Sequence, residues 1–469
     1  MLLACAAISA HAQTPLVNAP SPNLSSVTNQ FYGSVTTAKA TPETLQLSLD
    51  DAIARGLQTN LGLTLQQQTE RSEHGEMLSV FSSLVPNLSM SANTAAEEID
   101  LQALGFKPSL LAKFHIPPGE FPLIIKVNTT QAQVKMTQQL FSMPAIELYK
   151  AAKAVIQEGH LDVLNARGGV VITVGTQYLH TLADAAQIDN ANALLRADQE
   201  LLRQATESHK AGVSTNLDEL RARVQYQTQQ QALINAENTF AKDKMALNRM
   251  IGLPPEQPIE LTDTVPYAEL AAIPLEETKQ IAYARRKDYL SMQQQVRAAE
   301  LERKAAKYER LPTLNIKANY GVLGVTEGLY HGVFNAEASL NFPIFKEASL
   351  RGDREVADAS LNDLHARLAD LQVTIESQLR SSRLDVNAAA ELVKVARSNV
   401  DLATEELQQS ADRFQAGVSD NLPVVQAQAT LADAQAQLVS ALYQFNQAKL
   451  TLARNTGVVE TQYKIYLGR

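Results

Sequence analysis

Residues 211–222 read AGVSTNLDELRA, and residues 416–427 read AGVSDNLPVVQA, 205 positions later. The correspondence runs without a gap to residues 253 and 458, and 15 of its 43 positions are identical. A repeat of this length predicts two structural units that pack against each other. Gly212 and Gly417 stand where one long helical pattern ends and the next begins, a place where glycine adopts a left-handed conformation without steric cost. We therefore predict two long helical hairpins.

The composition of the 469-residue chain fits long helices better than several compact domains. Aromatic residues make up 5% of the chain, Trp is absent, and Ala and Gln are abundant, as is typical of helices with narrow contact seams. The net charge of −9 does not supply the basic face that binding to nucleic acid requires. We therefore expect no nucleic-acid partner.

The N-terminus has the features of an export signal. A short apolar run over residues 2–10 precedes Ala10-His11-Ala12, a small-x-small cleavage site that predicts a signal peptide over residues 1–12. The usual basic segment before the run is missing, so a start codon further upstream is one alternative. Cys5, the only cysteine, lies in a sequence that resembles a lipoprotein cleavage box, which is a second alternative.

Four segments alternate strictly between apolar and polar residues, as half-buried strands do. Two of them follow Pro86 and Pro312, each of which ends a helical pattern. The first pair is separated by a long loop, about 97–126, and the second by a short glycine-rich one. The predicted order in each half is helix, strand, strand, long helix, turn, helix. The strands are expected at about 86–94, 130–141, 312–321 and 333–345.

The remaining segments are predicted to be helical. Single helices are expected at about 47–83 and 275–310, and residues 353–415 would form a helix about 95 Å long. Two heptad patterns predict the seam between this helix and its partner. The first seam is Val393, Ala396, Val400, Ala403, Leu407, Ser410 and Phe414. The second is Leu422, Val425, Ala429, Ala432, Ala436, Val439 and Tyr443.

The strand pattern favours a membrane barrel, because one face of every strand is apolar and the other is polar. Four strands cannot close a barrel, whereas two chains would supply eight strands and three would supply twelve, with room for a channel. A sheet in a sandwich with one wet face remains the alternative. No stretch reaches the roughly 18 apolar residues of a spanning helix.

The order of these elements resembles that of the TolC-like outer-membrane efflux family. The similarity rests on the two turns (210–214 and 413–419), the helix ends (247–252 and 452–457) and the strand-to-helix motifs (139–141 and 342–345), and it covers residues 44–457. It implies a homotrimer whose twelve-stranded barrel in outer-membrane lipid continues into a periplasmic coiled-coil tunnel. It further implies a periplasmic adaptor and an inner-membrane pump as partners.

The resemblance also implies site residues at the two turns. The adaptor would dock at the periplasmic tip, which corresponds to Gly212, Val213, Arg413, Gly417 and Val418. The tunnel would constrict near Asp218, Asp420 and Gln426. Two structural alternatives stand beside these roles: both glycines end helices, and both acids lie at helix starts, where the helix dipole favours them.

The expected function is the exit duct of a tripartite efflux or type I secretion system in the outer membrane. The alternative is a periplasmic coiled-coil adaptor or scaffold without a barrel. Enzyme motifs are absent, and the eight histidines are scattered, so no catalytic residue, cofactor or metal site is expected. The predicted units are the signal peptide (1–12), an extended arm (13–43), repeat 1 (44–253), a linker (254–274), repeat 2 (275–457) and a tail (458–469).

Overall fold

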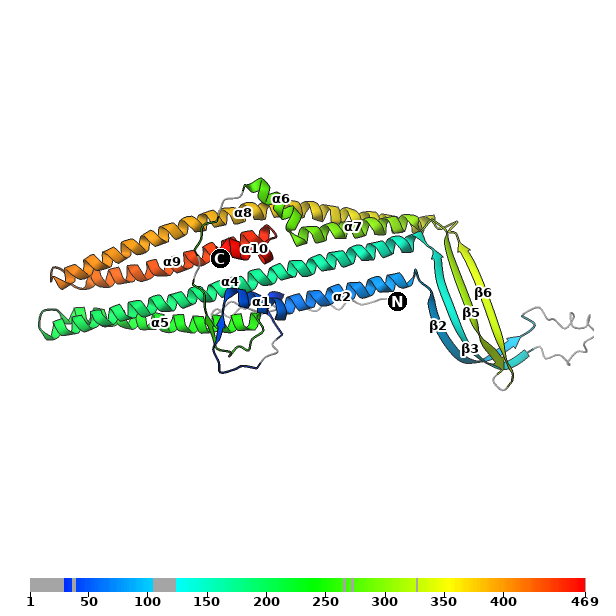
Figure 1. The fold of residues 1–469 in the computed structure, drawn as a ribbon, viewed down its shortest axis with the longest axis horizontal. Coiled ribbons are helices and arrows are strands. Elements are labelled where there is room, and N and C mark those ends of the chain that lie inside the picture. The colour runs from blue at the N-terminus through cyan, green and yellow to red at the C-terminus, as the bar shows by residue number, and fades with distance from the viewer. Residues whose placement is uncertain are drawn as a thin grey trace, which may run out of the picture.

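The computed structural model describes residues 29–35, 39–103, 124–264, 267–270, 274–325 and 328–468. The predicted signal peptide, the motif around Cys5, residues 13–28 of the predicted arm and most of the first strand-connecting loop lie outside these ranges. The molecule is a long helical bundle with a sheet of strands at one end (Figure 1).

The order of elements is the predicted one, and it occurs twice. The first repeat contains α1 (Leu49–Thr59), α2 (Leu61–Ser82), β2 (Asn87–Asp100), β3 (Ile124–Phe141), α4 (Met143–Lys210) and α5 (Asn216–Met250). The second contains α6 (Leu275–Arg285), α7 (Lys287–Tyr308), β5 (Thr313–Val325), β6 (Tyr330–Asn341), α8 (Glu347–Gln415) and α9 (Leu422–Asn455). The other elements are a 3-10 helix η1 (Gln30–Tyr32), β1 (Leu45–Leu47), β4 (Ile259–Leu261) and α10 (Val459–Leu467).

The single helices predicted at 47–83 and 275–310 are each broken in two. Asn60 separates α1 from α2 with ψ 131°, and its side-chain oxygen accepts hydrogen bonds from the first amides of α2. Arg286 separates α6 from α7 with ψ 121°. Each break packs against the glycine that ends its own repeat. A Cβ on Gly252 would lie 2.5 Å from Thr59 Oγ1, and a Cβ on Gly457 would lie 2.6 Å from Arg286 N. The breaks are thus part of the duplicated packing.

The four long strands form one antiparallel sheet in the order β2-β3-β5-β6. In the register of β5 with β6, Ala318 faces Ala336 and Ile316 faces Ala338, whereas Asn319 faces Asn335. Partners in an antiparallel pair lie on the same face. The sheet therefore has one apolar and one polar face across both repeats, as the alternation predicted.

Three of the four strands are longer than the sequence indicated. The fourth, β6, begins three residues before the start and ends four residues before the end of its predicted range of 333–345. The predicted first loop, 97–126, begins only after Asp100, because residues 97–100 still pair with 124–127. In the second pair, β5 continues past its predicted end at residue 321 to Val325. A Cβ on Gly321 would meet the carbonyl of Ala132, on β3, at 2.2 Å. Glycine at this position permits a close approach of β3 rather than a turn.

The long helices pair as two hairpins, α4 with α5 and α8 with α9. The predicted seam on α8 is confirmed, since Val393, Ala396 and Ala403 are buried. The predicted seam on α9 is wrong by two positions, and of its members only Val439 is buried. The other apolar residues buried there include Val424, Ala427, Leu431, Ala434, Ala441 and Phe445. Helix α9 packs against both α8 and α4, and its Ala-rich sequence supports more than one pattern of 3- and 4-residue spacing.

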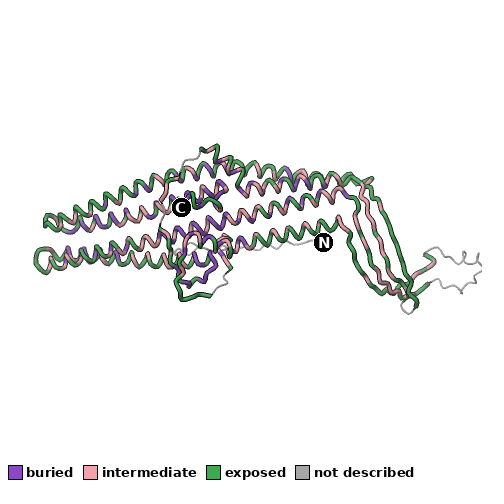
Figure 2. Tube along the Cα trace, in the orientation of Figure 1, coloured by how far each residue is buried: buried purple, intermediate pink, exposed green. Residues whose placement is uncertain are grey.

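The largest apolar core lies midway along the molecule, where α1, α4, α5, α9 and α10 meet the two-stranded parallel sheet of β1 and β4. Tyr178 is fully buried there, and its hydroxyl donates to the carbonyl of Leu47 at 3.0 Å. The predicted linker thus contributes a strand, and the predicted tail contributes α10. Figure 2 shows buried residues along the helices, while the strands are exposed or half-buried.

Among the helices that the structure describes, none combines the length and the apolarity needed to span a membrane.

Candidate functional site: the hairpin tips and the strand sheet

The two hairpin turns lie side by side at the end of the molecule opposite the sheet (Figure 1). In the first turn, Val213 N donates to the carbonyl of Ser208 at 2.9 Å, and Gly212 N donates to that of His209 at 2.9 Å. In the second, Val418 N donates to Arg413 O at 3.0 Å. This is the Schellman ending, which requires a left-handed residue after the helix. Gly212 and Gly417 supply it with φ +74° and +68°.

The tips expose apolar side chains to the surroundings. Val213 and Val418 are 79% and 70% exposed. A Cβ added to Gly212 or Gly417 would meet nothing within 4 Å. Arg413 is exposed in the last turn of α8. All five docking candidates thus lie at or beside the turns on an open surface. Glycine is favoured at residues 212 and 417 by the left-handed backbone and not by a lack of space for a side chain.

The two turns are tied to each other by polar contacts. Asn421, fully buried, donates from its side-chain nitrogen to the carbonyl of Asp218 at 2.7 Å. The guanidinium of Arg221 lies 3.2 Å from a carboxylate oxygen of Asp420 and 3.7 Å from one of Asp218. Asp218 and Asp420, both predicted near the constriction, are therefore brought together by a residue that the sequence reasoning missed. The spacing of Asp218 and Arg221, three residues apart on one helix, was the available signal.

The constriction candidates differ in their surroundings. Asp218 is buried and forms a capping box with Thr215, in which each side chain accepts from the other residue's backbone nitrogen. Asp420 and Gln426 are exposed. Glu219, next to Asp218, accepts a hydrogen bond from His209, and this bond holds the pKa of Glu219 below its usual range, with Arg223 contributing. The observed role of Asp218 is to start α5.

Asp198 is a buried acid on α4 within the first hairpin, 1% exposed. Gln225 donates to one of its oxygens at 3.4 Å, and within the described residues the other oxygen has no hydrogen-bond partner. Burial raises the pKa of Asp198 to about 6. The corresponding position in the second repeat, 205 residues later, is Ala403, which is buried in an apolar cluster.

We expect Asp198→Asn to stabilise the protein at neutral pH. The folded pKa is raised above the unfolded value, so the folded state binds more protons between about pH 4 and 6, and stability falls as pH rises through that window. A shift of one pKa unit corresponds to ~1.4 kcal/mol. The gain in free energy of unfolding should be about 1–2 kcal/mol, because the buried amide that replaces the carboxylate still carries a desolvation cost. Thermal unfolding at about pH 5 and about pH 7.5 checks this: the variant should lose less stability between them than the wild type.

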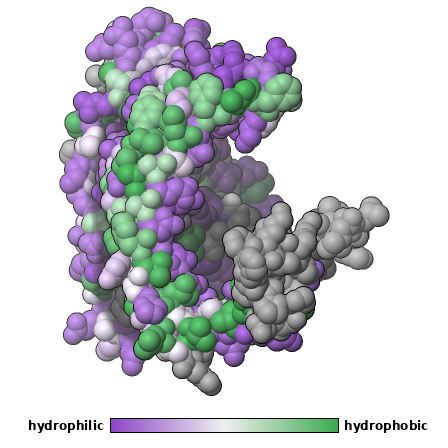
Figure 3. Space-filling model, turned by 90° about the vertical axis from the view of Figure 1, so that its right-hand side faces the viewer, coloured by the Kyte–Doolittle hydropathy of each residue, from purple (hydrophilic) through white to green (hydrophobic). Residues whose placement is uncertain are grey.

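The sheet also exposes apolar side chains. Five large ones along it are 66–77% exposed, namely Leu88, Met90, Tyr320, Phe334 and Leu340. Figure 3, which views this end of the molecule, shows a vertical strip of hydrophobic residues with hydrophilic residues on either side. Strands β2 and β6 have no partner on their outer edges within the described sheet.

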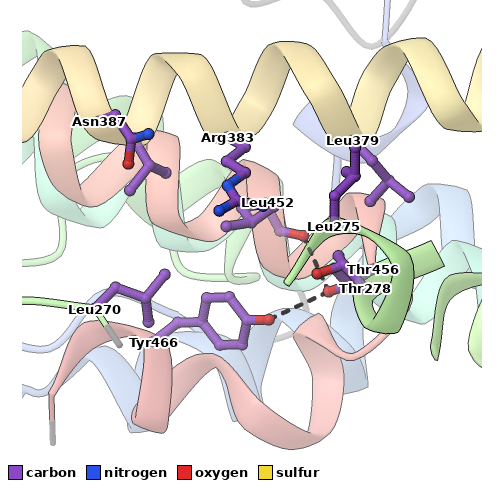
Figure 4. Close-up of a pocket in the computed structure, with 10 residues that line it drawn as sticks. Leu270, Leu275, Thr278, Leu379, Arg383, Asn387, Leu452, Thr456 and Tyr466 are labelled. Carbon is purple, nitrogen blue, oxygen red and sulfur yellow. Dashed lines mark hydrogen bonds between the residues drawn. The ribbon is translucent and has the colours of Figure 1, made fainter. Parts of the chain in front are cut away.

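A cavity between α6, α8, α9 and α10 measures about 140 Å³. Leu379, Leu452 and Tyr466 line it, and the Tyr466 hydroxyl lies 3.4 Å from Thr456 Oγ1 (Figure 4). Pockets that bind drug-sized molecules measure roughly 300–1,000 Å³. This cavity therefore belongs to the packing of α10 and is not a candidate ligand site.

Comparison with known proteins gives a consistent match. The family described as outer membrane efflux protein matches residues 79–253 and 279–458. The probable efflux pump outer membrane protein SepC of Pseudomonas putida is 25% identical over 339 residues, which cover 69% of this chain and 68% of that protein. The alkaline protease secretion protein AprF of Pseudomonas aeruginosa is 22% identical over 354 residues, 73% of this chain and 72% of that protein.

Solved structures share the fold. The outer membrane protein VceC of Vibrio cholerae superposes with a TM-score of 0.72 at 16% identity, covering 87% of this chain and 96% of that one. The CmeC outer membrane channel of Campylobacter jejuni gives 0.75 at 14% identity, covering 95% and 94%.

Proposed function

Because the chain belongs to the outer membrane efflux protein family, we propose that it is the outer-membrane exit duct of an efflux or type I secretion system. The observation that carries this proposal is the separation of two surfaces by helices of 68 and 69 residues, about 100 Å of rise. A sheet with one apolar face lies at one end, and paired hairpin tips lie at the other (Figure 1).

The sheet requires partner chains in this function. Its outer strands offer unpaired backbone groups, and an open edge is not tolerated in lipid. Three copies would supply twelve strands, enough for a barrel with a channel, with apolar residues toward lipid and polar residues toward water. The apolar set on the lipid side would include Leu88, Met90 and Phe334.

The tips are the proposed docking surface for a periplasmic adaptor and, through it, an inner-membrane pump. Val213 and Val418 offer exposed apolar contacts, and Arg413 offers a charge. Gly212 and Gly417 hold the turns in shape. Asp420 and Gln426, exposed near the second turn, are the proposed constriction residues, whereas Asp218 is proposed there only through its shared contact with Arg221.

The cargo is proposed to be small molecules or proteins. SepC is named for an efflux pump and AprF for protease secretion, so both classes belong in the assay. An adaptor or scaffold is the weaker alternative, because an adaptor would carry one hairpin flanked by globular β domains. In its described ranges, this chain carries two helical hairpins and a four-stranded sheet with one apolar and one polar face.

The test is fractionation combined with mass determination of the detergent-extracted protein. We expect a helix-rich trimer in the outer membrane that co-purifies with an inner-membrane transporter. Deletion should raise sensitivity to exported toxic compounds or abolish secretion of a protein, which separates the two cargo classes. A monomer in the soluble periplasmic fraction would refute the channel and favour the adaptor.

A further inference from the structure

Three side chains with metal-binding groups converge between α4 and α5. His180 and Asp184 lie one turn apart on α4, and Asp243 reaches them from α5. The Nδ1 atom of His180 lies 3.0 Å from Asp243 Oδ2 and 3.5 Å from Asp184 Oδ2. One potential ligand atom from each of the three residues lies within 4.8 Å of the other two.

The second repeat shows that helix packing does not need these groups. Its corresponding positions, 205 residues later, are Asp385, Ala389 and Ala448. Ala389 is buried between α8 and α9, and Ala448 packs against the same cluster. Two small apolar residues therefore suffice for the corresponding contact between α8 and α9. Only the first repeat places two carboxylates and an imidazole there.

The surroundings hold the three groups in place. Gln177 approaches the second oxygen of Asp243 at 3.5 Å. The ring of Tyr443, from α9, meets the His180 ring edge-on with 5.2 Å between centroids. The carboxylate side chains are 16% and 15% exposed, whereas that of His180 is 43% exposed. Two acids are thus gathered in a half-buried site that stays open to solvent on the imidazole side.

We propose that His180, Asp184 and Asp243 bind a divalent transition-metal ion of the Zn²⁺ class. Ligand atoms about 2.0–2.2 Å from a tetrahedral Zn²⁺ stand about 3.3 Å from each other, close to the 3.0 and 3.5 Å observed. One imidazole with two carboxylates suits Zn²⁺ or Co²⁺ better than Mg²⁺. The open side leaves room for a water ligand.

Charge balance supports the same ion. A neutral imidazole and two carboxylates around a divalent cation sum to zero charge. The ion would join α4 to α5 at the level of the central core. The inference stands on this helix pair and does not depend on the channel function.

The experiment uses the full-length, untagged protein in detergent after treatment with a chelator. Titration with Co²⁺ is followed by its visible absorption, and titration with Zn²⁺ by calorimetry. We expect one ion per protomer and a rise in thermal stability on adding Zn²⁺. Asp184→Ala with Asp243→Ala, which copies Ala389 and Ala448, should abolish both.

Two further variants sharpen the test. Gln177→Ala should weaken binding by about tenfold, as loss of an orienting neighbour does. His160→Ala is the control, since His160 has a carboxylate, Glu70, 3.1 Å from its ring nitrogen and should not change the stoichiometry. If the double alanine variant fails to assemble, His180→Gln, which keeps both acids, replaces it. Wild-type protein without the Co²⁺ spectrum, or an unchanged stoichiometry in an assembled ligand variant, overturns the proposal.

Discussion

Ala336→Arg is expected to block insertion of the protein into the outer membrane, whereas Asn335→Arg, one residue earlier, should be tolerated. Both residues lie near the middle of β6. Ala336 pairs with Ala318 on the apolar face, and Asn335 pairs with Asn319 on the polar face. An arginine that faces lipid near the midplane costs roughly 2–4 kcal/mol, and a trimer carries it three times. Residue 335 would face water inside the channel.

The measurement is the amount of each variant in the outer-membrane fraction, together with its trimer content in detergent. The two residues are neighbours in β6 and would lie at the same depth in the membrane. The difference between the two variants therefore reports only which face of the sheet contacts lipid. Equal loss for both variants would mean that the apolar face does not contact lipid. Normal insertion of Ala336→Arg would lead to the same conclusion.

The parts of the fold that the sequence predicted depend on repetition and on side-chain period. The 205-residue offset required that each element occur twice. Gly212 and Gly417 located both turns correctly, because a glycine that ends a long helix adopts the left-handed conformation such a turn requires. Strict alternation identified all four long strands and the face on which each residue lies, since a period of two is specific to strands. The strand ends were predicted less well, because pairing continues after the alternation stops.

Tertiary contacts decided what the sequence left open. The break at Asn60 carries no proline, and the glycine that ends the repeat packs beside it. The predicted seam on α9 differs from the observed one by two residues. Helix α9 contacts two helices, and alanines on several of its faces fit a heptad pattern equally well. Strand β4 consists of three residues that pair with a segment near the start of the chain, and no local pattern reveals such a pairing.

In the candidate sites, too, local patterns were predicted from the sequence and tertiary contacts were not. The turn glycines and exposed valines were found from sequence, and their docking role stays a prediction. The capping box of Asp218 was readable from Thr215, three residues earlier, but Arg221 between Asp218 and Asp420 required the two hairpins to be placed together. The cluster around His180 was missed because Asp243 comes from another helix. The four-residue spacing of His180 and Asp184 was its only local signal.

Gly417→Val and, separately, Arg413→Glu are expected to reduce efflux strongly while leaving trimer level and insertion close to wild type. The Gly417 backbone has φ +68°, and the space around it is open. The cost therefore comes from the left-handed conformation itself, about 1–2 kcal/mol for a residue with a Cβ and more for a β-branched one. That strain reshapes the tip. The sheet lies about 100 Å away along the 69 residues of α8 and has little reason to respond.

Matched variants separate docking from folding. Gly417→Asn should retain most efflux, because asparagine tolerates the left-handed region. Gly457 ends α9 with the same geometry, φ +77°, but its Cβ would meet the backbone of Arg286 at 2.6 Å, so Gly457→Val should lower the protein level itself. Gly212→Val then reports whether the two turns are used equivalently. Drug susceptibility in a strain that depends on this protein is the readout. If both Gly417→Val and Arg413→Glu keep wild-type resistance, the docking role is refuted and these residues serve only to end the helix.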